Sequence, residues 1–128
     1  MLTWLGEIQV SEGRLSVLPA VGWRRGTARF RHDQQPIEVA ALADAAATAA
    51  LATGDPGWEV LVDRAVAWFL GDNDIGVAMW DPATGGAYDG LTLQGPNLNQ
   101  GAESTLALVS TLQHARHNAR VRGVLTPP

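Results

Sequence analysis

An alanine-rich segment most constrains what this chain can fold into. Residues 36 to 53 read PIEVAALADAAATAALAT, and Gly54 follows. Proline at the first helical position and glycine just past the last are typical of helix ends. Val39, Leu42 and several alanines share one face, and small side chains allow a neighbouring helix to approach closely. The sequence therefore predicts a helix over 36–53 that packs against other helices.

Three further helices are predicted from apolar spacing. Residues 57–70 follow the tight turn GDPG and carry apolar side chains at intervals of three and four. A helix over 101–117 is expected to bury Leu106, Val109 and Leu112. Residues 1–9 form only one or two turns, with Leu2, Leu5 and Ile8 on one face, and a short strand is expected near 15–18.

A repeat of about 65 residues relates the two halves of the chain. TWLGEIQ resembles AWFLGDN, and each is followed by a long polar loop and then by the spacing QxxE, as Gln35 and Glu38 and as Gln100 and Glu103. A short turn between helices 36–53 and 57–70 makes them antiparallel neighbours. Both long loops, and both QxxE motifs, are then expected at one end of the helices. We predict an all-α fold of antiparallel helical hairpins in a single domain, 1–128, with its loops on one rim.

The QxxE motifs have two interpretations. If Gln35 and Gln100 are N-cap residues, Glu38 and Glu103 lie at the capping-box position, where a carboxylate favours the positive end of the helix. This accounts for the glutamates better than for the glutamines, because Gln is not a preferred N-cap. The alternative interpretation is a binding site assembled from both motifs.

The loops between the helices carry the side chains that sugars need. Amides and carboxylates supply acceptors and donors for hydroxyl groups, and aromatic rings pack against the C–H faces of a sugar. Two carboxylates on one rim could also act as an acid and a base or nucleophile in glycoside cleavage. The candidate catalytic carboxylates are Glu38 or Asp33 from the first loop and Glu103 or Asp89 from the second; the candidate sugar-binding residues are Gln35, Gln100, Asn97, Asn99, Trp80 and Tyr88. The alternative is that these side chains only hold turns and loop backbone.

Composition and charge exclude several classes of function. A net charge of −4 argues against a general nucleic-acid-binding protein. The absence of cysteine excludes thiolate chemistry and is in keeping with a cytoplasmic location. No apolar run reaches the length of a membrane span, and the N-terminus does not resemble a signal peptide. No phosphate-loop, dinucleotide or metal-binding motif is present, so no cofactor and no metal are expected.

Arginines gather in the segment GWRRGTARFRH, residues 22–32. A guanidinium is a planar fork of donors, so Arg24, Arg25, Arg29 and Arg31 beside Trp23 and Phe30 could hold a phosphate or stack on a ring. The alternative is a solvated loop or short hairpin with alternating arginines.

The stretch WFLGDNDIGVAMWDPATGGAYDGLTLQGPNLNQGAEST resembles part of bacterial glycosyltransferase-associated proteins of the six-hairpin, glycosidase-like (α/α)-toroid kind. The shared pattern is a helix ending in WFLG, an aspartate-rich stretch, a YDPxTGG turn, a DG pair and NxNQGAES. Trp80 stands here in place of the tyrosine, and Ala87 occupies a place that is often polar. FRHDQQPIEVAALADA fits the upstream part, so the resemblance covers residues 1 to 117.

The resemblance implies a partial (α/α) toroid whose loop rim handles carbohydrate, within a glycosyltransferase-associated or glycosidase-like protein. A closed toroid needs about a dozen helices, so the chain is expected to be a fragment of a larger one, or to cover its helix faces with a partner domain or a second copy. Whether the chain is an enzyme stays open, since the resemblance assigns no acid or base and the isolated chain could be inactive. The alternative function is a non-catalytic helical packing module.

Overall fold

Two antiparallel helices form the centre of the molecule in a computed structural model, which describes residues 1–121 and 123. The alanine-rich segment is helix α2, Pro36–Thr53. It ends at Gly54, whose φ of 69° is left-handed and whose N–H donates to Ala50 O at 2.8 Å. Helix α3, Gly57–Phe69, follows the short turn and packs along α2. Both helices were predicted from the sequence.

Helix α4, Ala102–Val121, lies across α2 and α3. Its position was predicted, but the face that it buries was not. Ala107, Leu108 and Thr111 are buried, whereas Leu106, Val109 and Leu112 are 67%, 44% and 41% exposed. The assignment of those three residues to the core is therefore wrong. Ala107 faces the alanine-rich α2, since it lines one groove with Ala40 and Ala41, and small side chains allow the two helices to pack closely.

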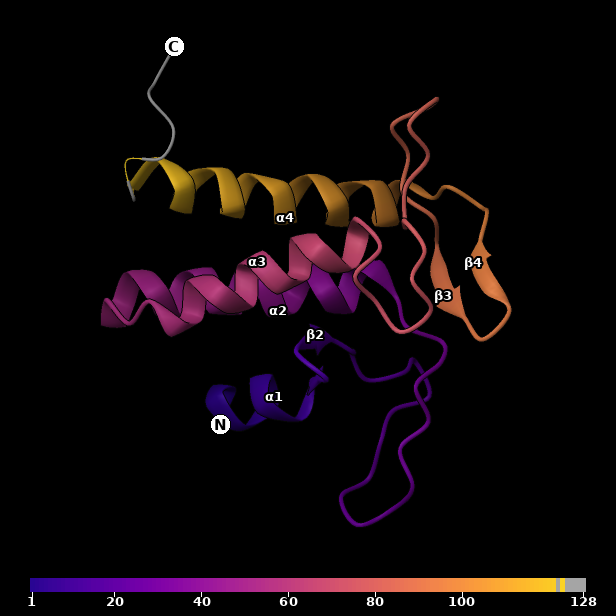
Figure 1. The fold of residues 1–128 in the computed structure, drawn as a ribbon, viewed down its shortest axis with the longest axis horizontal. Coiled ribbons are helices and arrows are strands. Elements are labelled where there is room, and N and C mark those ends of the chain that lie inside the picture. The colour runs from indigo at the N-terminus through magenta and orange to yellow at the C-terminus, as the bar shows by residue number, and fades with distance from the viewer. Residues whose placement is uncertain (122, 124–128) are drawn as a thin grey trace.

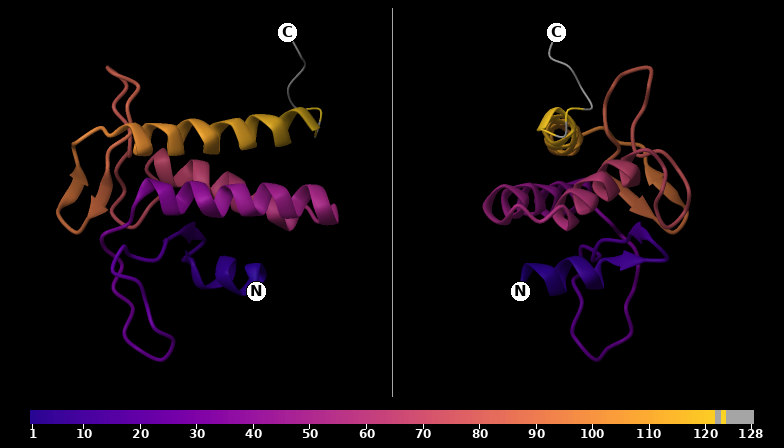
Figure 2. Two further views of the ribbon diagram at one scale, coloured as in Figure 1. Left: turned by 180° about the vertical axis from the view of Figure 1, so that it is seen from behind. Right: turned by 60° about the vertical axis from the view of Figure 1, so that its left-hand side comes forward.

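The N-terminal segment covers the opposite side of the α2–α3 pair from α4 (Figures 1 and 2). Helix α1, Leu2–Ile8, leads into the short strands β1, Val10–Ser11, and β2, Arg14–Leu15, which pair Val10 with Leu15 and Ser11 with Arg14. The predicted strand at 15–18 thus overlaps β2 by one residue. The long loop that follows extends away from the helices before it returns to α2 (Figure 1).

A second small sheet lies in the loop between α3 and α4. Strand β3, Gly90–Thr92, pairs with β4, Gly95–Asn97, in antiparallel register. Backbone groups of a loop that packs on a protein need partners, and hairpin pairing provides them without a helix. The expectation of an all-α partial toroid is therefore wrong. The chain is a small mixed domain of four helices and two two-stranded antiparallel sheets in its described residues.

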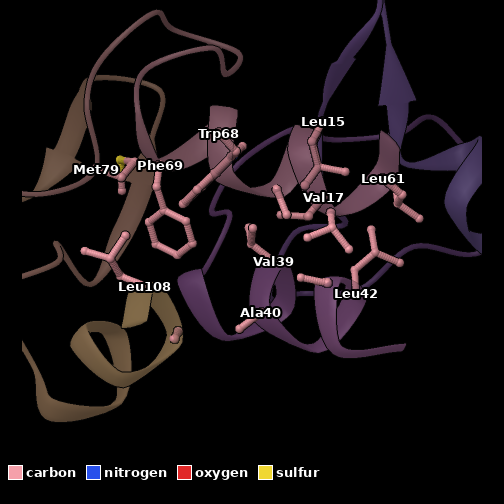
Figure 3. Close-up of a cluster of buried hydrophobic side chains, with 14 of the residues drawn as sticks. Leu15, Val17, Val39, Ala40, Leu42, Leu61, Trp68, Phe69, Met79 and Leu108 are labelled. Carbon is pink, nitrogen blue, oxygen red and sulfur yellow. The ribbon is translucent and has the colours of Figure 1, made fainter. Parts of the chain in front are cut away.

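The core joins the N-terminal segment to all three long helices. Figure 3 shows Leu15 and Val17 from this segment against Val39, Leu42 and Leu61. A second group contains Trp68, Phe69, Met79 and Leu108 (Figure 3). The rings of Trp68 and Phe69 pack edge to face, with their centroids 5.1 Å apart. The loop between α3 and α4 is fixed to this core through Met79, Ala87 and Leu91, all fully buried.

Helix α2 is the one described helix that is long and apolar enough to cross a membrane, with a mean hydropathy of 1.2 over 18 residues. The expectation that no segment reaches this length and hydropathy does not hold for α2. Core helices of globular proteins meet the same criterion. In this fold α2 packs on α3 and α4.

Candidate functional site

The two long loops meet at one end of the helices, as the sequence predicted. This end, called the rim here, carries the start of α2, the end of α3 and the start of α4 (Figure 1). The loops are joined by backbone pairing, because Gln34 N–H donates to Leu91 O at 3.1 Å and Leu91 N–H donates to Gln34 O at 2.8 Å. The rim is therefore one continuous surface.

A pocket of about 290 Å³ opens on the rim between the starts of α2 and α4. Gln35 lines it from the first loop, and Asp89 lines it from the second. The rest of the wall is the first turn of α4 with the residue before it: Gly101, Ala102, Glu103 and Ser104. This rim pocket brings together three of the candidate residues, Gln35, Asp89 and Glu103.

Asp89 holds the start of α4 in place. Its Oδ1 accepts from the Gly101 N–H at 2.7 Å and from the Ser104 hydroxyl at 2.7 Å, and its Oδ2 accepts from the Asn99 amide. The Ser104 bond, then the Gly101 and Asn99 bonds, lower the pKa of the Asp89 carboxyl below its usual value. Asp89 is thus an ionised cap that another segment supplies to α4.

The two QxxE motifs do not occupy equivalent positions. Gln35 is the residue before α2, so Glu38 is the third helical residue, but α4 begins only at Ala102, so Glu103 is the second. The predicted N-cap role of Gln100 is therefore wrong, because Asp89 caps the helix instead. Within the described residues neither glutamate carboxylate makes a hydrogen bond or ion pair, so the capping box is not formed. Glu103 lines the rim pocket, and Glu38 does not.

Gln100, Asn97 and Asn99 hold loop structure. The Gln100 amide donates to Asp81 Oδ2 at 3.2 Å, and its Oε1 accepts from the Thr84 hydroxyl at 2.6 Å. Gln100 thus fixes the turn at 81–86 to the start of α4. Asn97 Oδ1 accepts from the Asn99 N–H at 3.1 Å, and the Asn99 side chain donates to Asp89. None of the three lines the rim pocket.

The aromatic candidates pack inward. Trp80 and Tyr88 are partly buried against the hydrophobic core, and Trp80 pairs with Ala87 in a β-bridge. Asp33 is exposed, and its backbone carbonyl accepts from the Ala20 N–H at 2.8 Å. None of these three residues lines the rim pocket. The ring platform expected for a sugar is absent from the described wall of this pocket.

A buried polar network beneath the rim was missed by the sequence analysis. Gln34 is fully buried; its Oε1 accepts from the Trp68 indole N–H at 2.8 Å, and its amide donates to Asp74 Oδ2 at 2.5 Å. Asp74, with its side chain 2% exposed, also accepts from the Ser16 hydroxyl at 2.5 Å. The network ties the N-terminal segment to both loops and to α3. The sequence offers no signal that separates Gln34 from Gln35, since both precede the same helix.

Two arginines of the cluster, Arg29 and the exposed Arg31, contact groups of the fold. Arg29 donates to the carbonyls of Ile8 and Ser16, and burial of its guanidinium lowers its pKa. Arg31 lies 3.4 Å from Asp74 Oδ1. Arg24 and Arg25 are exposed. Half of the cluster therefore anchors the loop to the fold.

No group of three or more metal-ligating side chains occurs within the described part of the chain. His114 of α4 contacts Asp44 of α2 and so joins the two helices. The sequence matches no known protein family, and no curated protein matches it either.

Proposed function

We propose that this chain is a carbohydrate-binding segment of a glycosyltransferase-associated or glycosidase-like protein, and that its own role is binding, not bond cleavage. The observation that carries the proposal is the rim pocket. Gln35 and Glu103, from two motifs 65 residues apart in the sequence, line one cavity together with Asp89. A site built from both halves of the chain is what the second interpretation of QxxE requires.

The chemistry of the pocket suits hydroxyl groups. The Gln35 amide can both donate and accept, and the Glu103 carboxylate accepts only. The rim pocket has a volume of about 290 Å³, which is near the lower limit of small-molecule sites. The pocket therefore fits one sugar ring better than an extended oligosaccharide. Asp89 stabilises the wall and leaves ligand contact to Gln35 and Glu103.

Cleavage is disfavoured by the state and position of the carboxylates. A general acid must hold a proton near neutral pH, which requires a raised pKa, and the pKa of Asp89 is lowered. Glu38 and Asp33 do not line the rim pocket, so no carboxylate of the first loop faces Glu103 across it. Glu103 is then the ligand-binding carboxylate and not one of a catalytic pair.

The proposal is tested by calorimetric titration of the chain with methyl glycosides of glucose, mannose and galactose. At least one should bind in the millimolar range, and Glu103→Gln should weaken it about tenfold, as expected for loss of a hydrogen bond to a charged group. Glu38→Gln is the matched control, because it removes the same charge at the start of α2 without touching the pocket. Equal binding by both variants would contradict the proposal.

The second candidate function is a helical packing module, and the outward face of α4 favours it. Leu106, Val109 and Leu112 are exposed, and beside Leu106 a groove of about 370 Å³ runs between α2 and α4. Apolar side chains gathered on one surface mark interaction sites in many proteins. Sedimentation at rising concentration, with wild type and Leu106→Lys, tests whether a second copy covers this face.

A further inference from the structure

A second pocket, of about 420 Å³, lies between α1 and α3 and shares no residue with the rim pocket. Its floor contains Gly6 and Leu61, which are both buried. A side chain at position 6 would lie 3.2 Å from Leu61 Cδ2, so glycine allows the close approach of the two helices beneath the pocket. No residue of this α1–α3 pocket was among the sequence-based candidates.

The walls combine one aromatic ring with polar groups of both hydrogen-bonding kinds. Trp58 is partly buried and packs against the core, so its ring is held in place. Glu7 and Asp55 bring carboxylates, Arg64 a guanidinium and Thr3 a hydroxyl. Asp55 Oδ1 accepts from the Gly57 N–H at 2.8 Å, which fixes this carboxylate at the start of α3.

We propose that the α1–α3 pocket is a binding site for a neutral polyhydroxylated ring, such as a hexopyranose unit. The ring face packs on Trp58, as C–H faces of sugars pack on aromatic side chains, while carboxylates accept and the guanidinium and hydroxyl donate. The volume lies within the range of small-molecule sites.

The walls carry two carboxylates and one guanidinium, a net charge of −1 that disfavours an anion and only partly favours a cation. Two carboxylates repel an anion. A cation is attracted by Glu7 and Asp55 but repelled by Arg64 in the same wall. Hydroxyl groups carry no charge and can use the acceptors and the donors together.

The site is tested by amide and indole NMR spectra of the ¹⁵N-labelled chain during titration with methyl α-glucopyranoside. The Trp58 indole N–H and the Gly6 and Gly57 amides should shift. The Trp68 indole, bonded to Gln34 inside the core, should not move and so reports an intact fold. Tetramethylammonium is the contrasting probe and should cause no shift at these positions.

Four variants complete the test. Glu7→Gln should weaken the affinity measured from these shifts about tenfold. Trp58→Phe keeps an aromatic ring on the core and should weaken the affinity less, as measured at the Gly6 and Gly57 amides. Glu38→Gln, outside both pockets, should bind as wild type. Glu103→Gln distinguishes sugar binding in the α1–α3 pocket from sugar binding in the rim pocket. It should leave the Trp58 shifts unchanged whether or not the rim pocket binds sugar.

Three results would overturn the proposal. The first is the absence of shifts at Trp58, Gly6 and Gly57 at high millimolar sugar. The second is equal shifts in wild type and Glu7→Gln. The third is a response of these signals to tetramethylammonium in place of the sugar, which would identify a cation site.

Discussion

Two neighbouring glutamines separate the part of the rim that holds the fold from the part that is open to a ligand. Gln34 is fully buried and bonds to Trp68, Asp74 and the carbonyl of Arg31, which lies 2.7 Å from its amide. Gln35 lines the rim pocket, and no side-chain bond of Gln35 caps α2. A buried amide whose polar atoms are all bonded stabilises the fold, whereas an amide at a pocket wall is available to bind.

Replacement of Gln34 by alanine should lower the free energy of unfolding by about 2–3 kcal/mol, since it leaves the Trp68 N–H and the Asp74 carboxylate without this partner. Gln35→Ala, the matched control, should cost less than about 0.5 kcal/mol. Urea denaturation followed by circular dichroism measures both. A loss for Gln34→Ala as small as that expected for Gln35→Ala would contradict this role of the network.

Asp89 should make stability depend on pH in the acid range. Because its folded pKa lies below the unfolded value of about 3.9, its contribution is present at neutral pH and is lost as pH falls through the folded pKa. Asp89→Asn should therefore be destabilised by about 1 kcal/mol at pH 7 and approach wild type toward pH 3. Thermal unfolding of the two proteins between these pH values provides the measurement, and a constant difference would be the contrary result.

At the scale of elements, the positions of the helices could be predicted from the sequence, but the buried face of α4 could not. Proline, glycine and apolar spacing located α2 and α3, because these signals are local. In α4, Leu106, Val109 and Leu112 were expected inside, yet Ala107, Leu108 and Thr111 are buried instead. Periodicity marks an apolar face but cannot tell whether a partner covers it.

Alanine substitutions along α4 test this assignment directly. Leu108→Ala should cost about 2–4 kcal/mol, as expected for a buried leucine. Leu106→Ala, on the same helix but 67% exposed, should change stability by less than about 0.5 kcal/mol in the monomer. Chemical denaturation at low protein concentration gives both values; a larger loss for Leu106→Ala would return that residue to the core.

The same limits apply to the loops. Their position at one rim followed from the order of helices and turns, but the pairing of Gln34 with Leu91 and of β3 with β4 depends on contacts between distant residues. The sequence therefore predicted that polar side chains gather at the rim. It did not show which of them form hydrogen bonds within the loops. Gln100, Asn97 and Asn99 were predicted to bind a ligand, but their side chains form hydrogen bonds within the loops. Such bonds leave no periodic signal in the sequence, so their role in the loops could not be recognised from it.

At the scale of the whole molecule, α2 and α3 form a central layer with α4 on one face and the N-terminal segment on the other (Figure 2). The rim pocket uses the α4 side, and the α1–α3 pocket uses the opposite side. Ligands at the two sites would therefore not compete for the same residues. Their titrations should be independent, so a variant in one pocket should leave the affinity of the other unchanged.

The central claim, that the starts of α2 and α4 form one sugar-binding pocket, is tested most directly by mapping amide shifts in the wild-type chain during titration with the methyl glycosides. We expect Gln35, just before α2, and Gly101 and Ser104, at the start of α4, to shift together along one binding curve, with the buried Trp68 indole N–H unmoved. Shifts that occur at only one of the two helix starts, or none at the rim, would contradict the claim.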